Sequence, residues 1–222
     1  MRWIVTVTLG ALLPLMSLVA AAQGPLPTAA RLRAGASAPL APPLVIGGGE
    51  VVLDVTVSRD GGVTRVEPVR TTPPYTDLLT GAVRAWRFDP PKALVKGALL
   101  SAEGHVLVVA MYRPPQVYSA PAPGAETKTV GDLSPELPTP TSLAMPVAYP
   151  PLATRDGAVL IELELTMAGM VREARVMSRA SAFDGAALDT VKRWRFDIPR
   201  DPAGAEQIYA YAVVGFREPI TQ

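Results

Sequence analysis

The sequence predicts an α+β protein built from two tandem small domains. Each domain is expected to be a three-stranded antiparallel sheet packed by a helix, in the order strand, strand, helix, strand. Residues 49–91 align with residues 157–199 without a gap, and ten positions are identical. The repeat ends in "WRFD" both times, at Trp86–Asp89 and Trp194–Asp197. Both copies also begin with alternating apolar and polar residues, which is typical of a strand with one buried face.

The alternating runs cover residues 51–58 in the first copy and 159–166 in the second. Each is followed by a glycine-containing turn, "RDGG" with Gly61 and "MAGM" with Gly169. Glycine adopts a positive φ without steric cost, so these turns predict a hairpin that leads into a second strand. Gly61 and Gly169 are therefore assigned structural roles.

A helix is predicted next in each copy, because apolar residues recur at helical spacing up to Trp86 and Trp194. The equivalent residues Thr76 and Asp184 are predicted to cap its N-terminus, and prolines end it. The helical stripe should pack on the small sheet. The aromatic residues assigned structural roles in this packing are Trp86, Trp194, Phe88 and Phe196.

A final strand closes each copy, at His105–Arg113 and Ile208–Arg217. A three-stranded sheet leaves backbone groups unpaired at its edges, and such an edge is able to pair with another chain. These last strands are the predicted binding edges.

The N-terminal segment, residues 1–22, has one basic residue, an apolar run and an alanine-rich end. This pattern predicts a secretory signal peptide, with an uncleaved membrane anchor as the alternative. An Ala/Pro-rich segment covers 23–47, and the first domain covers 48–118. A Pro-rich stretch without periodicity, 119–145, is expected to be an extended linker before the second domain at 146–222.

The second copy resembles the C-terminal domain of TonB, the periplasmic energy transducer of Gram-negative outer-membrane transport. The resemblance rests on "AYPPLATRDGAVLIELELTMAGMV", on "VKRWRFDIP" and on "AVVGF". Tyr149 and Pro150 begin this pattern and are assigned structural roles. The first copy has "APPLVIGGGEV" in place of the Tyr-Pro start but keeps the glycine turn and "AVRAWRFDPP".

The resemblance implies a periplasmic, non-catalytic protein that binds an extended peptide by strand addition. The implied partner is the N-terminal peptide of an outer-membrane receptor in TonB-dependent transmembrane transport, and the second copy is the favoured binding module. The candidate partner-binding residues are Arg87, Arg195, Tyr209, Tyr211, Val213, Phe216 and Arg217.

Two alternatives remain open at this point. The modules could pair edge to edge in a structural or assembly protein, through self-association or with a contact to peptidoglycan. The chain could instead be a membrane-anchored energy transducer. The sequence argues against the transducer hypothesis, because proton coupling within a membrane needs an ionisable side chain there. The only histidine is His105, and the N-terminal apolar run holds no ionisable residue beyond Arg2.

Composition argues against other classes of function. The 21 basic and 20 acidic residues nearly balance, so no nucleic-acid partner is expected. The absence of cysteine and the single histidine leave no nitrogen or sulfur ligand set for zinc. No nucleophile motif or phosphate-binding loop is present either. The sequence therefore predicts no catalytic residue, no metal site and no cofactor.

Overall fold

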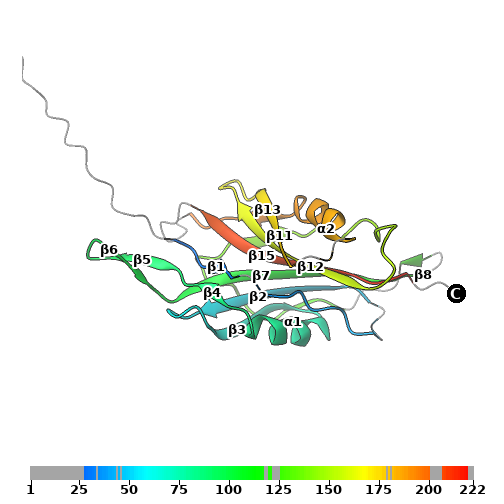
Figure 1. The fold of residues 1–222 in the computed structure, drawn as a ribbon, viewed down its shortest axis with the longest axis horizontal. Helices are drawn as coiled ribbons and strands as arrows, with labels where there is room; N and C mark the ends of the chain where they lie inside the picture. Colours follow the sequence, from blue (N-terminus) through cyan, green and yellow to red (C-terminus); the bar gives the residue numbers. More distant parts are fainter. Residues whose placement is uncertain are drawn as a thin grey trace, which may run out of the picture.

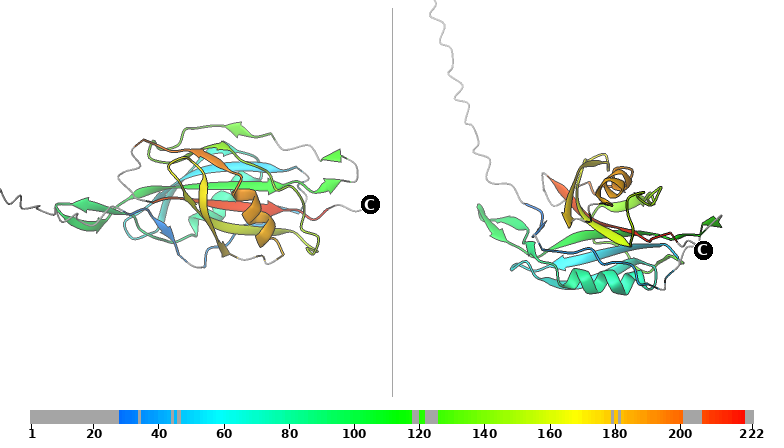
Figure 2. Two further views of the ribbon diagram at one scale, coloured as in Figure 1. Left: turned by 90° about the horizontal axis from the view of Figure 1, so that it is seen from above. Right: turned by 45° about the vertical axis from the view of Figure 1, so that its right-hand side comes forward.

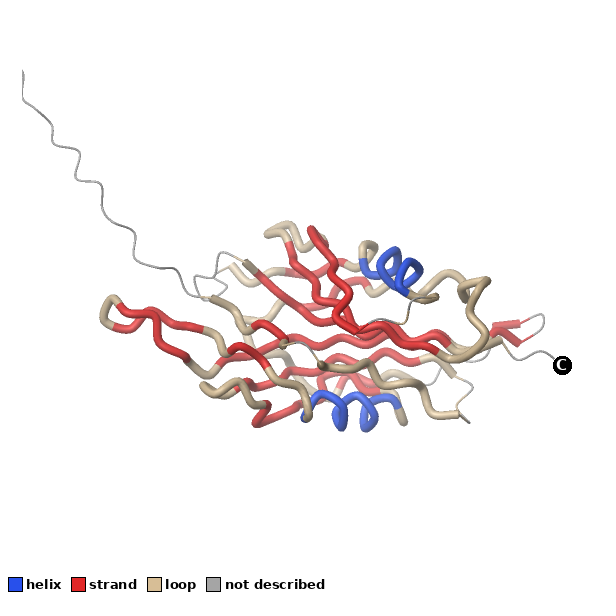
Figure 3. The backbone as a smooth tube through the Cα atoms, in the orientation of Figure 1, coloured by secondary structure: helices blue, strands red, loops and turns tan. Residues whose placement is uncertain are grey.

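The computed structural model describes residues 28–33, 35–43, 45, 47–117, 120–121, 126–178, 180, 182–200 and 207–219. The predicted signal peptide, residues 1–22, lies outside the described residues. The described part is a mixed α+β structure in which two helices accompany one large sheet (Figures 1 and 3).

The large sheet has seven strands in the order β10-β3-β2-β7-β15-β12-β13. The duplicated sequence supplies three strands from each copy, and a short strand between the copies supplies the seventh. Their bounds are Lys128–Thr129 for β10, Val63–Thr71 for β3, Gly49–Val57 for β2, Gly104–Arg113 for β7, Ile208–Phe216 for β15, Gly157–Leu165 for β12 and Val171–Ser178 for β13.

The expectation of two separate three-stranded sheets is corrected by the pairing of β7 with β15. These strands run parallel in the middle of the sheet, from Ala210 opposite Leu107 to Phe216 opposite Arg113. Together they join the first unit (β2, β3 and β7 with its helix) to the second unit (β12, β13 and β15 with its helix). The predicted binding edges are therefore interior strands.

The two units are related by an approximate twofold axis that runs along the strands. Tyr112 pairs with Gly49, and Phe216 pairs with the equivalent Gly157, so Tyr112 and Phe216 are equivalent. In the sheet, however, Tyr112 lies opposite Gly215 rather than Phe216. This offset of one residue points equivalent side chains to opposite faces, because side chains alternate along a strand.

The helices accordingly cover opposite faces of the sheet (Figures 1 and 2). Helix α1 (Tyr75–Arg84) packs with Leu53 and Val108 in one core, and helix α2 (Asp184–Val191) packs with Ile161 in the other. Neither predicted N-cap forms. Thr76 and Asp184 lie within the first helical turn, and their side chains accept backbone N–H groups four residues upstream, at Thr72 and Ala180.

The segments expected to be spacers are part of the folded units. We call the described residues of 28–45 the first arm and residues 126–145 the second arm. In the first arm, β1 (Arg31–Leu32) pairs with β4 (Phe88–Asp89). In the second arm, β11 (Thr139–Ser142) pairs with β14 (Arg195–Asp197). The two pairings occupy equivalent positions, so the structural repeat begins upstream of the repeat recognised in the sequence.

Each arm covers the sheet of the other unit. Leu32 of the first arm packs with Leu160 and Tyr211 of the second unit, and Leu137 of the second arm packs with Val52 of the first. The predicted Pro-rich linker therefore contributes to the core. A hairpin, β5 (Lys92–Val95) and β6 (Ala98–Ser101), and a short pair, β8 (Gln116–Val117) and β9 (Ala120–Pro121), complete the strands of the described part.

Candidate protein-interaction site

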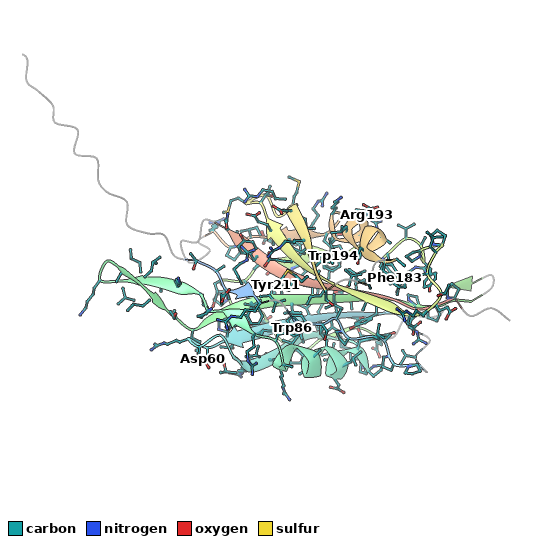
Figure 4. All side chains as sticks on the ribbon, viewed as in Figure 1. Asp60, Trp86, Phe183, Arg193, Trp194 and Tyr211 are labelled. Carbon is teal, nitrogen blue, oxygen red and sulfur yellow. The ribbon has the colours of Figure 1, made fainter. Side chains whose placement is uncertain are left out.

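The two tryptophans of the repeated motif attach the arms to the helices. The Trp86 indole donates a hydrogen bond to the Ser37 carbonyl at 3.3 Å, and the Trp194 indole donates to the Ala144 carbonyl at 2.9 Å. Both rings are buried in equivalent places, one on each side of the sheet (Figure 4). Burial together with a satisfied indole N–H is consistent with a structural role.

The phenylalanines of the motif fix the glycine turns. The backbone N–H groups of Phe88 and Phe196 donate to the carbonyls of Gly61 and Gly169, each at 2.9 Å. Both glycines have positive φ, 84° and 73°, and a Cβ at either would lie within 2 Å of the facing phenylalanine carbonyl oxygen. Glycine is therefore needed for both the turn and the close approach of the backbone.

The motif arginines contact backbone carbonyls and remain exposed. Arg87 donates to the Trp86 carbonyl at 2.9 Å, and Arg195 donates to the carbonyls of Lys192 and Trp194 at 3.1 and 2.8 Å. These bonds satisfy carbonyls at the C-terminal end of each helix. The exposed side chains are still accessible to a partner.

The candidate binding residues Tyr211, Val213 and Phe216 are buried in the middle of the sheet. Their predicted place on an exposed edge is wrong, because β7 occupies that edge. The Tyr211 hydroxyl accepts the Leu32 N–H at 2.8 Å and lies 3.2 Å from a carboxylate oxygen of Glu162. Burial, and then the negative charge of Glu162, raise the pKa of Tyr211.

Arg217, another candidate binding residue, is also engaged within the chain. Its guanidinium donates to three first-arm carbonyls, and its Nε lies 2.9 Å from a carboxylate oxygen of Asp156. Tyr209 is half-buried, and the Arg31 guanidinium lies 4.0 Å from its ring centroid. Of the candidates on this strand, only Tyr209 retains appreciable exposure.

Tyr149 and Pro150 lie in the loop that precedes β12. The Tyr149 hydroxyl donates to the Arg155 carbonyl at 2.7 Å, and its ring makes an edge contact with Phe183, with centroids 5.8 Å apart. The Phe183 ring in turn occupies the space that a Cβ at Gly157 would need. Pro150 is buried. The Tyr-Pro start therefore supports the aromatic packing at this end of the second unit.

Two equivalent carboxylates hold the arms, and the sequence pattern did not reveal this role. Asp54 accepts the Ser134 backbone N–H at 2.9 Å and lies 2.6 Å from Nδ1 of His105. Glu162 accepts two bonds from Arg31 of the first arm. Asp54 and the Ser134 hydroxyl both approach the same nitrogen of His105, at 2.6 and 3.0 Å. This geometry differs from a catalytic triad, in which the two partners use opposite ring nitrogens.

The sheet ends in the two-residue strand β10 beside β3 on one side and in β13 on the other. The β3 edge carries β10, in which Lys128 pairs with Thr71 and Thr129 with Arg70. The β13 edge has no neighbouring strand beyond β12 among the described residues. Its backbone groups there form a row that is able to pair with an added strand.

A hollow of about 730 Å³ lies beside the end of β13. It is bounded by small residues at the ends of β12 and β13, by the loop before β12 and by part of the first arm. Its lining includes Leu40, Leu152, Ala158, Ser178, Ala180 and Phe183. Leu40 and Leu152 are exposed large apolar side chains, at 53% and 87%.

The described part of the chain contains neither a candidate membrane span nor a candidate metal site. None of its helices is long and apolar enough to cross a membrane. No group of three or more His, Cys, Asp or Glu side chains there is placed to hold a metal ion. Comparison with protein-family models, with curated proteins and with solved structures found no match.

Proposed function

We propose that this chain is a non-catalytic binding protein that adds an extended segment of a partner protein to the free edge of β13. The observation that carries the proposal is the occupied edge at the other end of the same sheet. There, β10 pairs with β3, and the Val130 N–H extends the ladder to the Val69 carbonyl at 2.9 Å. The chain itself thus provides an example of strand addition at the equivalent edge.

The side chains of β13 suit an extended, amphipathic peptide. Val171, Ala174 and Val176 contact the core on the α2 side and are only partly buried. Arg172 and Arg175 contact Glu164 and Glu162, and each arginine remains 56% exposed. An added strand would meet apolar groups on one face and charged groups on the other, while main-chain bonds supply the affinity.

The resemblance to the TonB C-terminal domain supplies the class of partner. On that basis the partner is the N-terminal peptide of an outer-membrane receptor and the site of binding is the periplasm. In the described part of the joined sheet, β10 pairs with the end of β3 at Arg70 and Thr71, whereas β13 has no added strand along its whole length. The proposal therefore moves the binding strand from Ile208–Arg217 to β13.

The test combines peptide titration with amide hydrogen exchange on the full mature chain. Synthetic peptides from the N-terminal segments of outer-membrane receptors are added, and protection of the backbone amides is mapped. Binding should protect amides of β13, and methylating alternate peptide nitrogens should abolish it, because a methylated nitrogen cannot donate to the ladder. The proposal is refuted if the correctly folded chain binds none of the peptides, or if a peptide binds without protecting the amides of β13.

An assembly protein is the second candidate function. It is favoured by the same β7–β15 pairing, which uses one edge of each unit, and by the reciprocal cover of the arms. In this case the modules serve each other as partners. A correctly folded chain that binds none of the peptides but shows slow exchange throughout β7 and β15 would favour this function.

A further inference from the structure

The two units differ at the positions beside their outer edges. In the first unit, Arg70 of β3 forms an ion pair with Glu50 of β2 at 2.5 Å, and its other terminal nitrogen donates to the Pro140 carbonyl at 2.9 Å. The residues at the equivalent positions of the second unit are Ser178 and Ala158. Two long charged side chains are thus replaced by two small ones.

The hollow beside β13 lies where those charged side chains are missing. Ala158 and Ser178 both line it, and Phe183 closes one side. In the first unit, the hydroxyl of Thr72 lies 2.9 Å from the hydroxyl of Thr127, which directly precedes β10. The equivalent residue in the second unit is Ala180, and it also lines the hollow. The second unit therefore has an unpaired edge strand among the described residues and, next to it, a space lined by small and apolar side chains together with Thr154, Arg155 and Asp156.

We propose that this hollow is the specificity pocket of the strand-addition site and takes a bulky apolar side chain of the added peptide. The inference rests on the proposed function, since it identifies which residue of the partner the site selects. The first unit provides the comparison: there an ion pair stands at the positions of Ala158 and Ser178, and the adjoining end of β3 pairs with the chain's own β10.

The size and lining of the hollow define the chemistry of its ligand. Its volume of about 730 Å³ is more than one aromatic or large aliphatic side chain needs, so such a group fits against Leu40, Leu152 and Phe183, while Arg155 and Asp156 lie on the polar side of the hollow. The exposed side chains of Leu40 and Leu152 would be covered by such a group. Removing this apolar surface from water favours a bulky apolar residue over alanine by roughly tenfold or more in affinity.

The decisive variant transplants the ion pair of the first unit. Ala158→Glu combined with Ser178→Arg fills the hollow with side chains that the equivalent backbone positions already accommodate in the first unit. The backbone edge of β13 is unchanged. The control is Gly81→Ala, a substitution in α1 with open space around the new methyl group.

The first measurement uses free side-chain analogues and does not depend on strand addition. N-acetyl-phenylalanine amide and N-acetyl-alanine amide are titrated while the alanine methyl resonances of the hollow are followed by NMR. The proposal expects saturable shifts with the phenylalanine compound for wild type and for Gly81→Ala, and none for the double variant. Absence of saturable shifts in wild type, or equal shifts in the double variant, overturns the pocket.

The second measurement uses a receptor peptide that protects β13, compared with versions in which each apolar residue is changed to alanine. One position should lose roughly tenfold in affinity for wild type and should lose little for the double variant, which still binds through the edge. If the double variant keeps the same loss, the pocket is refuted while strand addition stands. If no peptide protects β13, strand addition fails, and the methyl shifts alone decide whether the pocket exists.

Discussion

Arg217→Met should destabilise the protein strongly, whereas Arg113→Met should not. These arginines occupy equivalent positions. Arg113 follows Tyr112, which pairs with Gly49, and Arg217 follows Phe216, which pairs with the equivalent Gly157. Arg217 bonds to three carbonyls and lies 2.9 Å from Asp156. Arg113 is also buried and donates from Nε to the Pro146 carbonyl. In the described structure one nitrogen of each guanidinium lacks a hydrogen-bond partner, but Nε of Arg217 lies in an ion pair with Asp156, whereas Nη1 of Arg113 lies in none.

The difference follows from how each charge is compensated. Removing Arg217 leaves three carbonyls without their donor and the Asp156 carboxylate without its ion-pair partner, which costs about 3–5 kcal/mol of unfolding free energy. Removing Arg113 eliminates a poorly paired buried charge, and desolvation already lowers the pKa of this guanidinium. Methionine fills similar space without needing hydrogen bonds, so the change should range from neutral to about 2 kcal/mol stabilising.

Urea denaturation followed by tryptophan fluorescence measures both variants against wild type at pH 7. The Arg217→Met midpoint should fall with an unchanged slope, and the Arg113→Met midpoint should stay or rise. Equal losses of several kcal/mol for both variants would refute the reasoning, because they would show that Arg113 has stabilising partners comparable to those of Arg217.

Two further predictions concern backbone conformation and pH. Gly169→Ala should lower the unfolding free energy by about 2–4 kcal/mol, since a Cβ there would lie 1.7 Å from the Phe196 carbonyl oxygen and φ is 73°. Gly81→Ala lies in α1 with open space around the new methyl group, so in the same denaturation assay it should raise the unfolding free energy by up to about 1 kcal/mol. Burial raises the pKa of Tyr112 and Tyr211, so their protonated forms stabilise the fold fully below the usual tyrosine pKa of about 10, and this contribution is lost as the pH rises above it. Absorbance of tyrosinate should show that these two rings ionise only together with unfolding, and ionisation of all tyrosines in the folded chain near pH 10 would contradict this.

The repeated unit could be predicted because its determinants are local. Alternation of apolar and polar residues specifies which side chains of β2 and β12 share a face. The expectation that only one face is buried is wrong, because the arms cover the other face and leave Asp54 and Glu162 only 3% and 4% exposed. The structure confirms the positive φ at Gly61 and Gly169 and the burial of Trp86 and Trp194. Each of these features depends on neighbouring residues in one unit, so a single copy of the sequence contains the necessary information.

The prediction that the last strand of each unit is an edge strand is wrong, although the sequence contains a relevant signal. The runs "VLVVAM" in β7 and "YAYAVV" in β15 lack alternation, and a continuous apolar run is typical of a strand buried on both faces. Charged residues and Pro68 occur instead in β3 and β13, which is typical of edge strands. The arms were missed because their Ala/Pro-rich sequence has no periodicity and becomes ordered only against the other unit.

The sequence by itself determined the duplicated strand-hairpin-strand-helix-strand unit, its glycine turns and its buried aromatic residues. Tertiary structure alone decided that β7 pairs with β15, that the helices lie on opposite faces and that β13 has only β12 as a neighbour among the described residues. The physical reason is that backbone hydrogen bonds are the same for any neighbouring strand. The choice of neighbour therefore depends on burial summed over both units and both arms, which no local pattern contains.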